Sequence, residues 1–98
     1  MSLPVVFQPG VREEVDDAYV WYEQQRKGLG EAFLAAVQVA LDQIGQAPEA
    51  HAPIYRTVRH CQVKRFPFAV YYRAGSNRID VIAVHHGKRD PKTWQSKA

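Results

Sequence analysis

The spacing of apolar residues changes once along this chain, and the change constrains the fold more than any other sequence feature. From Val11 to Ile44, apolar residues recur three and four positions apart, which is the spacing of amphipathic helices. Beyond Ile54 the apolar period becomes two, which is the spacing of strands. A helical region followed by a strand region predicts an α+β fold.

Two helices are predicted before the change of period. The first begins at Val11 and ends at the turn Gly28-Leu29-Gly30, and the carboxylates in its opening turns complement the helix dipole. The second runs from about Glu31 to Gln46. A tight glycine-bearing turn between them predicts an antiparallel hairpin. Their core-facing stripes are Val11, Val15, Ala18 and Tyr22 in the first helix and Phe33, Val37, Ala40, Leu41 and Ile44 in the second.

Strands are predicted on both sides of the hairpin in the sequence. One N-terminal strand covers Leu3–Gln8, and Pro48 and Pro53 bracket a loop that contains His51. The strand region then divides at its turn residues into Thr57–Arg65, Phe68–Ala74 and Arg78–His86.

The last of these strands differs from the others in its apolar pattern. Val81–Val84 is apolar at every position, which indicates a central strand covered on both faces. The predicted fold is therefore an N-terminal strand, an α-helical hairpin and a three-stranded antiparallel meander. The helices pack on one face of the sheet, and the other face stays partly open.

Length and composition limit the class of protein. Residues 1–98 suffice for a single domain, and the apolar content of 46% argues against disorder. No apolar run approaches the roughly 18 residues of a membrane span, and no signal-peptide pattern opens the sequence. The single cysteine, Cys61, excludes an internal disulfide, and no cysteine or histidine has zinc-ligand spacing. We therefore expect a cytoplasmic protein without cofactor, metal or membrane partner.

The formal net charge of +3 conceals a strong asymmetry. Residues 1–50 hold three basic and eight acidic residues, a net charge of −5, whereas residues 51–98 hold ten basic and two acidic residues, a net charge of +8. All four histidines also lie in the second half. This distribution predicts a basic surface that faces an acidic partner, either nucleic acid or an acidic protein segment.

Four motifs follow one another along essentially the whole chain. They are Trp21–Gln25 leading into Gly28-Leu29-Gly30 and Phe33; Arg59 followed by Lys64–Tyr72; the hydrophobic run Ile79–Val84; and His85–Pro91 followed by Trp94. In this order they resemble the ParE/RelE superfamily of toxins from type II toxin–antitoxin (plasmid stabilization) systems, and the ParE branch more than the RelE branch. The resemblance implies the same α+β fold and a toxin held inactive in a hetero-oligomer with its antitoxin.

The ParE resemblance implies inhibition of DNA gyrase by trapping its complex with cleaved DNA. Such inhibition needs a binding surface and no catalytic residues. Trp94 would then be an aromatic anchor within a basic tail. The residues expected to bind the target or the antitoxin are Arg59, Lys64, Arg73, Lys88, Lys92 and Trp94.

The RelE branch implies an alternative, ribosome-dependent cleavage of messenger RNA. That chemistry needs a base for the 2′-hydroxyl, positive charge at the phosphate and an acid for the leaving oxygen. The catalytic residues would then be His86, Arg89 and Arg65, with His86 transferring a proton and Arg89 holding the phosphate. Two departures weaken this interpretation. The C-terminal stretch has Trp94 but no tyrosine, and the segment 59–65 has no carboxylate.

A third hypothesis is a non-toxic remnant or binding module that keeps the fold. Individual residues also carry structural interpretations, because a strand alternates its faces. His85 and His86 should therefore divide into one packed and one solvated side chain. Tyr22 and Cys61 are expected to pack, whereas Trp21 lies off the apolar stripe and would cover the hairpin or form a dimer contact.

Overall fold

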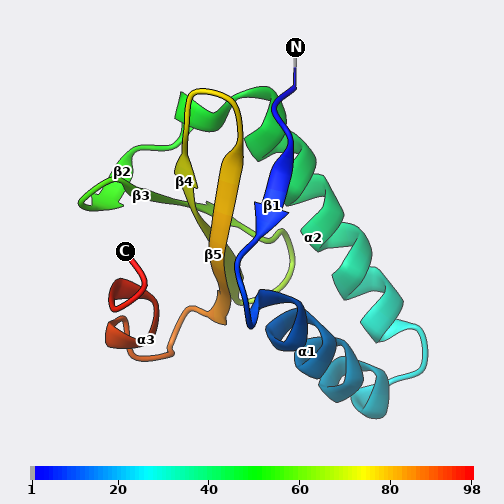
Figure 1. Cartoon of the computed structure of the whole chain (residues 1–98). Coiled ribbons are helices and arrows are strands. Elements are labelled where there is room, and N and C mark those ends of the chain that lie inside the picture. Colours follow the sequence, from blue (N-terminus) through cyan, green and yellow to red (C-terminus); the bar gives the residue numbers. More distant parts are fainter. Residues whose placement is uncertain (1) are drawn as a thin grey trace.

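A computed structural model describes residues 2–98 and confirms the α+β fold, with the helical hairpin packed on one face of a sheet (Figure 1). Among these residues no helix has the length and apolarity needed to cross a membrane. The elements are, in chain order, β1 (Val5–Phe7), α1 (Val11–Gln25), α2 (Leu29–Gln46), the 3-10 turn η1 (Pro48–Ala50), β2 (Pro53–Tyr55), β3 (Val58–Gln62), β4 (Phe68–Ala74), β5 (Ile79–His86) and α3 (Lys92–Gln95).

The sheet has five strands in the order β1-β5-β4-β3-β2. Strand β1 pairs with β5 in parallel, and the remaining neighbours are antiparallel. The prediction of four strands was one short, because β2 lies between the predicted loop, which ends at Pro53, and the strand predicted from Thr57. This strand has three residues and begins with Pro53, so it carries no alternating pattern, and its position at the sheet edge is the one that tolerates proline.

Strand β5 lies inside the sheet between β1 and β4 and is covered on both faces, as its apolar sequence indicated, although β4 holds the central position. A bulge explains its apolar pattern. In the β4–β5 register Tyr71 pairs with Ala83 and Tyr72 pairs with Val81, so Ile82 has no partner. This extra residue restarts the alternation of faces. Val81 and Val84 consequently join the core under the helices, whereas Ile82 and Ala83 join the core on the opposite face.

The helical hairpin depends on a close approach at its turn. Gly28 adopts a φ of 89°, and α2 begins at Leu29, two residues earlier than predicted. The Glu23 carboxylate accepts hydrogen bonds from the backbone N–H groups of Gly28 and Gly30, which satisfies the free donors at the start of α2. A Cβ at position 30 would lie 2.8 Å from the carbonyl oxygen of Tyr19, so only glycine lets the two helices meet here.

The two faces of the sheet are covered very unequally. The helix-side core combines the stripes of α1 and α2 with one face of the strands, and its largest fully buried side chains are Tyr72 and Phe33. The opposite face was expected to stay partly open. Instead the short helix α3, which the sequence did not predict, returns across it (Figure 1). The tail-side core consists of Val58, Ala69, Tyr71, Ile82, Ala83 and Trp94.

Candidate functional site

Basic residues gather at the end of the sheet where β4 begins and β5 ends. The backbone N–H of Gly87 donates to the carbonyl of Pro67 over 2.8 Å, which holds the β3–β4 turn beside the turn after β5. These turns carry four exposed basic residues, and Arg65 occupies the left-handed region with a φ of 73°. We call this set the basic end. It consists of Lys64, Arg65, Lys88 and Arg89.

A groove runs from the basic end along the flank of α1. The groove has two adjoining halves, and Ala18, Phe68 and His86 line both of them. Its apolar half, about 440 Å³, is completed by Trp21, Tyr22 and Pro67. Its polar half, about 330 Å³, is completed by Glu13, Glu14, Asp17, Val84 and Arg89. We call the two halves together the α1 groove.

His86 is the solvated member of the histidine pair, as predicted, and it faces the α1 groove. Its ring packs against Phe68 with 5.5 Å between the ring centroids. Its Nδ1 accepts a hydrogen bond of 3.0 Å from the backbone N–H of Lys88. In the neutral ring this bond places the proton on Nε2. In this tautomer both nitrogens of His86 are engaged, Nδ1 by the backbone and Nε2 by its proton, so neither is free to act as a general base.

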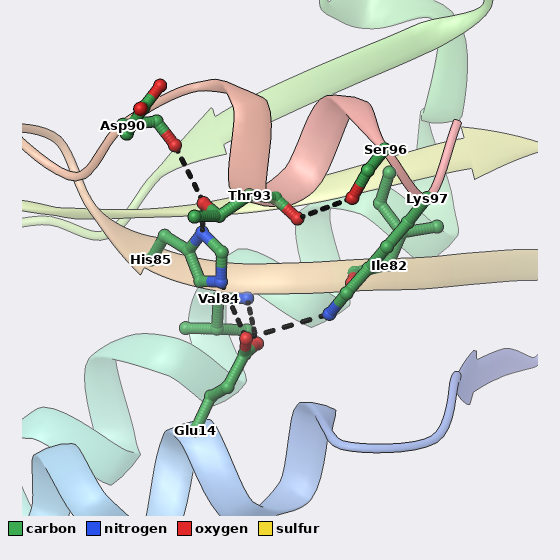
Figure 2. A network of polar contacts seen from close by, with 8 residues as sticks. All are labelled: Glu14, Ile82, Val84, His85, Asp90, Thr93, Ser96 and Lys97. Atoms are coloured by element: carbon green, nitrogen blue, oxygen red, sulfur yellow. Dashed lines mark hydrogen bonds and ion pairs between the residues drawn. The ribbon is translucent and has the colours of Figure 1, made fainter.

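His85 is the packed member of the pair, and it lies within a chain of polar contacts (Figure 2). Its side chain is 1% exposed, and Nε2 lies 2.5 Å from Oε2 of Glu14. Its Nδ1 lies 3.2 Å from the Thr93 hydroxyl, which itself donates to the carbonyl of Asp90. The hydroxyl donates to Asp90 and can therefore accept from Nδ1, while the Glu14 carboxylate can accept from Nε2. Each ring nitrogen of His85 thus has an acceptor within hydrogen-bond distance.

The Glu14 carboxylate is the centre of this network. It also accepts a hydrogen bond of 3.0 Å from the backbone N–H of Val84, and the ammonium of Lys97 lies 3.7 Å away. Burial raises the pKa of Glu14. The hydrogen bonds from His85 and Val84 and the charges of His85 and Lys97 outweigh burial, so the pKa lies below its usual range. One carboxylate thus joins α1, β5 and the C-terminal tail.

Sequence reasoning missed the role of Glu14. It assigned this residue, with its acidic neighbours, to the helix dipole. A usable signal was present in His85, because a histidine that extends a fully apolar strand needs a polar partner. The partner lies 71 residues away in the sequence, and no local pattern identifies it.

Trp94 does not form the exposed anchor that was expected. Its side chain is 6% exposed, and its ring stacks on Tyr71 with 4.6 Å between centroids and 19° between planes. Tyr55 contacts it edge-on at 5.9 Å. The reason is the course of the chain, since the turn after β5 reverses direction and lays α3 on the open face of the sheet. In this conformation the indole ring is buried in the tail-side core and is inaccessible to a partner.

The remaining basic residues lie apart from one another. Arg59 is half-buried on β3, where its guanidinium donates to the carbonyl of His51. Arg73 lies opposite Asp80 in the β4–β5 register, towards the end of β4 that is remote from the basic end. Lys92 is exposed at the first position of α3. The structure therefore groups only part of the predicted set.

The chemistry available at these positions is limited. Tyr71 is buried beside Trp94, and burial raises its pKa, while burial raises the pKa of Tyr72 to about 12. Neither phenol ionises near neutral pH. Cys61 is buried, as expected, and burial raises the pKa of its thiol. Within residues 2–98, no three histidine, cysteine, aspartate or glutamate side chains are placed to hold a metal ion.

The chain was compared with known proteins. Residues 5–91 match the family model of the ParE toxin of the type II toxin–antitoxin system parDE. Toxin ParE2 of Mycobacterium tuberculosis, in strains CDC 1551 / Oshkosh and ATCC 25618 / H37Rv, is 28% identical over 89 residues, which cover 90% of this chain and 85% of the relative.

A solved structure, described as the chromosomal ParDE TA system from P. aeruginosa, has a similar fold. Its TM-score is 0.65 at 18% identity, and the match covers 87% of this chain and 96% of the other. At this identity the likeness concerns the fold alone. The family model spans nearly the whole α+β domain, from β1 to the turn after β5. The chain therefore belongs to the ParE toxin family of type II toxin–antitoxin systems.

Proposed function

We propose that this toxin arrests growth by binding DNA gyrase in the cytoplasm, and that a cognate antitoxin neutralises it in a hetero-oligomer. Membership of the ParE family supports this proposal over messenger RNA cleavage. The observation that carries it further is the state of His86, whose Nδ1 is occupied by a backbone donor. A binding surface is available at the basic end, whereas a complete set of catalytic groups is not.

RNA cleavage at the α1 groove meets a further obstacle, which is electrostatic. Glu13 and Asp17 line the polar half together with Arg89. A phosphate held there by Arg89 would lie near these carboxylates, and like charges oppose its binding. Arg65, the third member of the proposed catalytic set, is absent from the lining residues. His86 and Arg89 therefore meet, but they do not form a phosphate site with Arg65.

The basic end suits a complex of protein and DNA. Lys64, Arg65 and Lys88 are exposed in turns and do not line the groove that holds the carboxylates, so they can contact a phosphate backbone without rearrangement of the sheet. Asp90 is the acidic residue of the turn after β5, and its side chain accepts a hydrogen bond from the backbone N–H of Lys92. We therefore expect the basic end, with Lys92 beside it, to contact the gyrase–DNA complex, and this binding to weaken as salt rises.

The test is a purified gyrase reaction with supercoiled DNA and the full-length toxin. The expected result is linear, gyrase-bound DNA in proportion to the added protein. The variant Lys88→Glu should reduce the linear product, whereas Lys27→Glu, at the exposed turn of the helical hairpin, provides a matched control and should not. No linear product at well above stoichiometric toxin would overturn the proposal.

A translation reaction then separates the remaining alternatives. Cleaved messenger RNA, lost in His86→Ala and Arg89→Ala while antitoxin binding persists, would establish the RelE-type activity. Expression of the toxin in a bacterial host without antitoxin provides a further control. Absence of growth arrest at every expression level would identify a non-toxic remnant of the family.

A further inference from the structure

The turn after β5, which carries Lys88 and Arg89, is held by hydrogen bonds at both of its ends. At its start, His86 accepts the backbone N–H of Lys88 on Nδ1 and that of Arg89 on its carbonyl, each over 3.0 Å. At its end, the carbonyl of Asp90 accepts the backbone N–H of Thr93 over 3.0 Å and the Thr93 hydroxyl over 2.7 Å. The two exposed cations are therefore attached to a backbone that is fixed on either side.

The Thr93 hydroxyl also connects this turn to the interior of the domain (Figure 2). It lies 3.2 Å from Nδ1 of His85, a side chain that is 1% exposed. The other ring nitrogen of His85 contacts the carboxylate of Glu14, which also accepts the backbone N–H of Val84 over 3.0 Å. Glu14 belongs to α1 and His85 to β5, so one hydroxyl ties the end of the turn to two elements of the main fold.

This chain of polar contacts supplies something that packing does not. Helix α3 is already attached to the sheet by the buried indole of Trp94, which stacks on Tyr71. Apolar contacts are non-directional, whereas a hydrogen bond requires a particular distance and angle. Burial of polar groups is costly unless they are paired, and apolar residues often replace a buried ion pair without loss of stability. The choice of Glu14, His85 and Thr93 is therefore best explained by the position that they give the turn.

We infer that Thr93 is a positioning residue of the basic end. Its hydroxyl, supported by His85 and Glu14, holds the backbone of Lys88 and Arg89 in the conformation that contacts the gyrase–DNA complex. This inference rests on the proposed binding of gyrase by the basic end. Its physical basis is that ordering a mobile segment on binding weakens the affinity, and a turn that is fixed beforehand avoids this loss.

The test titrates full-length toxin into the purified gyrase reaction. Thr93→Val removes the hydroxyl with little change of shape, and it should raise the toxin concentration that gives half-maximal linear DNA at least about 5-fold. Thr93→Ser keeps the hydroxyl and should stay within about 2-fold of the wild type. Ser96→Ala is the matched control and should act as the wild type does, because the Ser96 hydroxyl donates to the carbonyl of Thr93 over 3.2 Å within the tail.

A double-mutant cycle shows whether Thr93 acts through the turn. Lys88→Ala should raise the half-maximal toxin concentration less in the Thr93→Val background than in the wild type, because the turn is already mobile in that background. A merely structural role of Thr93 would give the same fold-change in both backgrounds. Equal fold-changes would therefore overturn the inference.

Hydrogen exchange in the free toxin provides a measurement that does not involve gyrase. In Thr93→Val the Arg89 amide should exchange at least about 10-fold faster, while protection in α2 stays unchanged. An Arg89 amide that keeps its wild-type rate would contradict a positioning role. Should α2 lose protection as well, Thr93→Ala, which removes the hydroxyl without adding a methyl group, is measured in its place.

The outcomes separate the inference from the proposed function. Wild-type toxin that yields linear DNA, together with an equally active Thr93→Val variant, overturns the inference and preserves the binding of gyrase. A loss in Thr93→Ser or Ser96→Ala as large as that in Thr93→Val also overturns it, because the hydroxyl at position 93 would then not be the cause. Wild-type toxin that yields no linear DNA overturns both.

Discussion

The two faces of the sheet make cores of very different construction. Sixteen of the described buried residues form the helix-side core, and they come from α1, α2 and the strands β3, β4 and β5 with the β3–β4 turn. Six form the tail-side core, and only Trp94 among them comes from outside the sheet. The first core is held by two long helices. The second is held by a four-residue helix, a stacked indole and the polar contacts around Glu14.

The two cores should therefore contribute differently to the free energy of unfolding and to local opening of the structure. A long amphipathic helix buries many side chains at once, so its removal is a global event. Helix α3 contributes one large side chain and is linked to the domain by the turn at Gly87–Pro91. We therefore expect the helix side to determine the free energy of unfolding and the tail side to open locally. Four predictions test this division, and they are arranged from the largest expected effect to the smallest.

Truncation of Phe33 should have the largest effect. This side chain is fully buried, and its ring packs within 5.3 Å, centroid to centroid, of Tyr22, Phe66 and Phe68. Phe33→Ala should lower the free energy of unfolding by about 3–5 kcal/mol through lost burial and a residual cavity. Urea denaturation measures this change. Val20→Ala, on the exposed side of α1, should stay within about 0.5 kcal/mol, and a comparable loss there would remove the distinction.

Glu14→Gln should have the next largest effect, because Glu14 connects the two sides. The amide carries no negative charge, so it can offer His85 and Lys97 only a neutral acceptor, and we expect a loss of about 1.5–3 kcal/mol at neutral pH. The pKa of Glu14 is lowered on folding, so its contribution is complete above the unfolded pKa near 4.5 and disappears as pH falls through the folded pKa. Urea midpoints from pH 6 to pH 3 should therefore decline more steeply in the wild type than in Glu14→Gln. Parallel curves would contradict this assignment.

Trp94→Ala should lower the free energy of unfolding by less than the burial of the indole alone suggests. Removal of a buried indole from a core costs about 3–5 kcal/mol, but detachment of α3 limits the loss to about 1–2 kcal/mol. Hydrogen exchange should then show faster exchange of the Gln95 and Ser96 amides and unchanged protection in α2. A loss equal to that of Phe33→Ala would mean that the tail is an integral part of the domain.

The smallest effect concerns His60, which lies on β3 beside Tyr71 with 5.8 Å between ring centroids. Burial, with a further contribution from His51, lowers the pKa of His60 below 6.5. As pH falls through 6.5 the unfolded chain takes up this proton first, so stability declines until the folded state is protonated as well. His60→Gln should flatten the stability profile between pH 7 and pH 5. It should leave the acid limb due to Glu14 unchanged.

Sequence reasoning recovered the parts of the fold that rest on local periodicity. The stripes of α1 and α2 persist over several turns, and β4 was placed at its observed bounds, Phe68–Ala74. The prediction failed where elements are too short to show a period. Strand β2 has three residues and α3 has four, so neither carries a recognisable pattern.

The candidate site was predicted less completely, because its geometry depends on contacts between distant segments. His86 and Arg89 were chosen for their chemistry, and they do line one groove. Trp94 was expected to anchor a partner, because nothing in the sequence indicates that the tail reverses onto Tyr71. The bulge at Ile82 could not be predicted either, because a run of four apolar residues is compatible with a regular strand and with a bulged one. The groove itself arises only when α1 and the ends of β4 and β5 are brought together.

The parallel pairing of β1 with β5 has a consequence for how the toxin is made. Strand β1 leaves the ribosome first, yet its partner is the last strand to be synthesised, and Glu14 likewise waits for residues 84 and 85. The strand that joins β1 to the rest of the sheet is therefore missing until translation is nearly complete. At roughly 5–20 residues per second the chain spends several seconds without a finished sheet. A nascent or prematurely terminated chain should therefore lack the complete sheet and both of its cores.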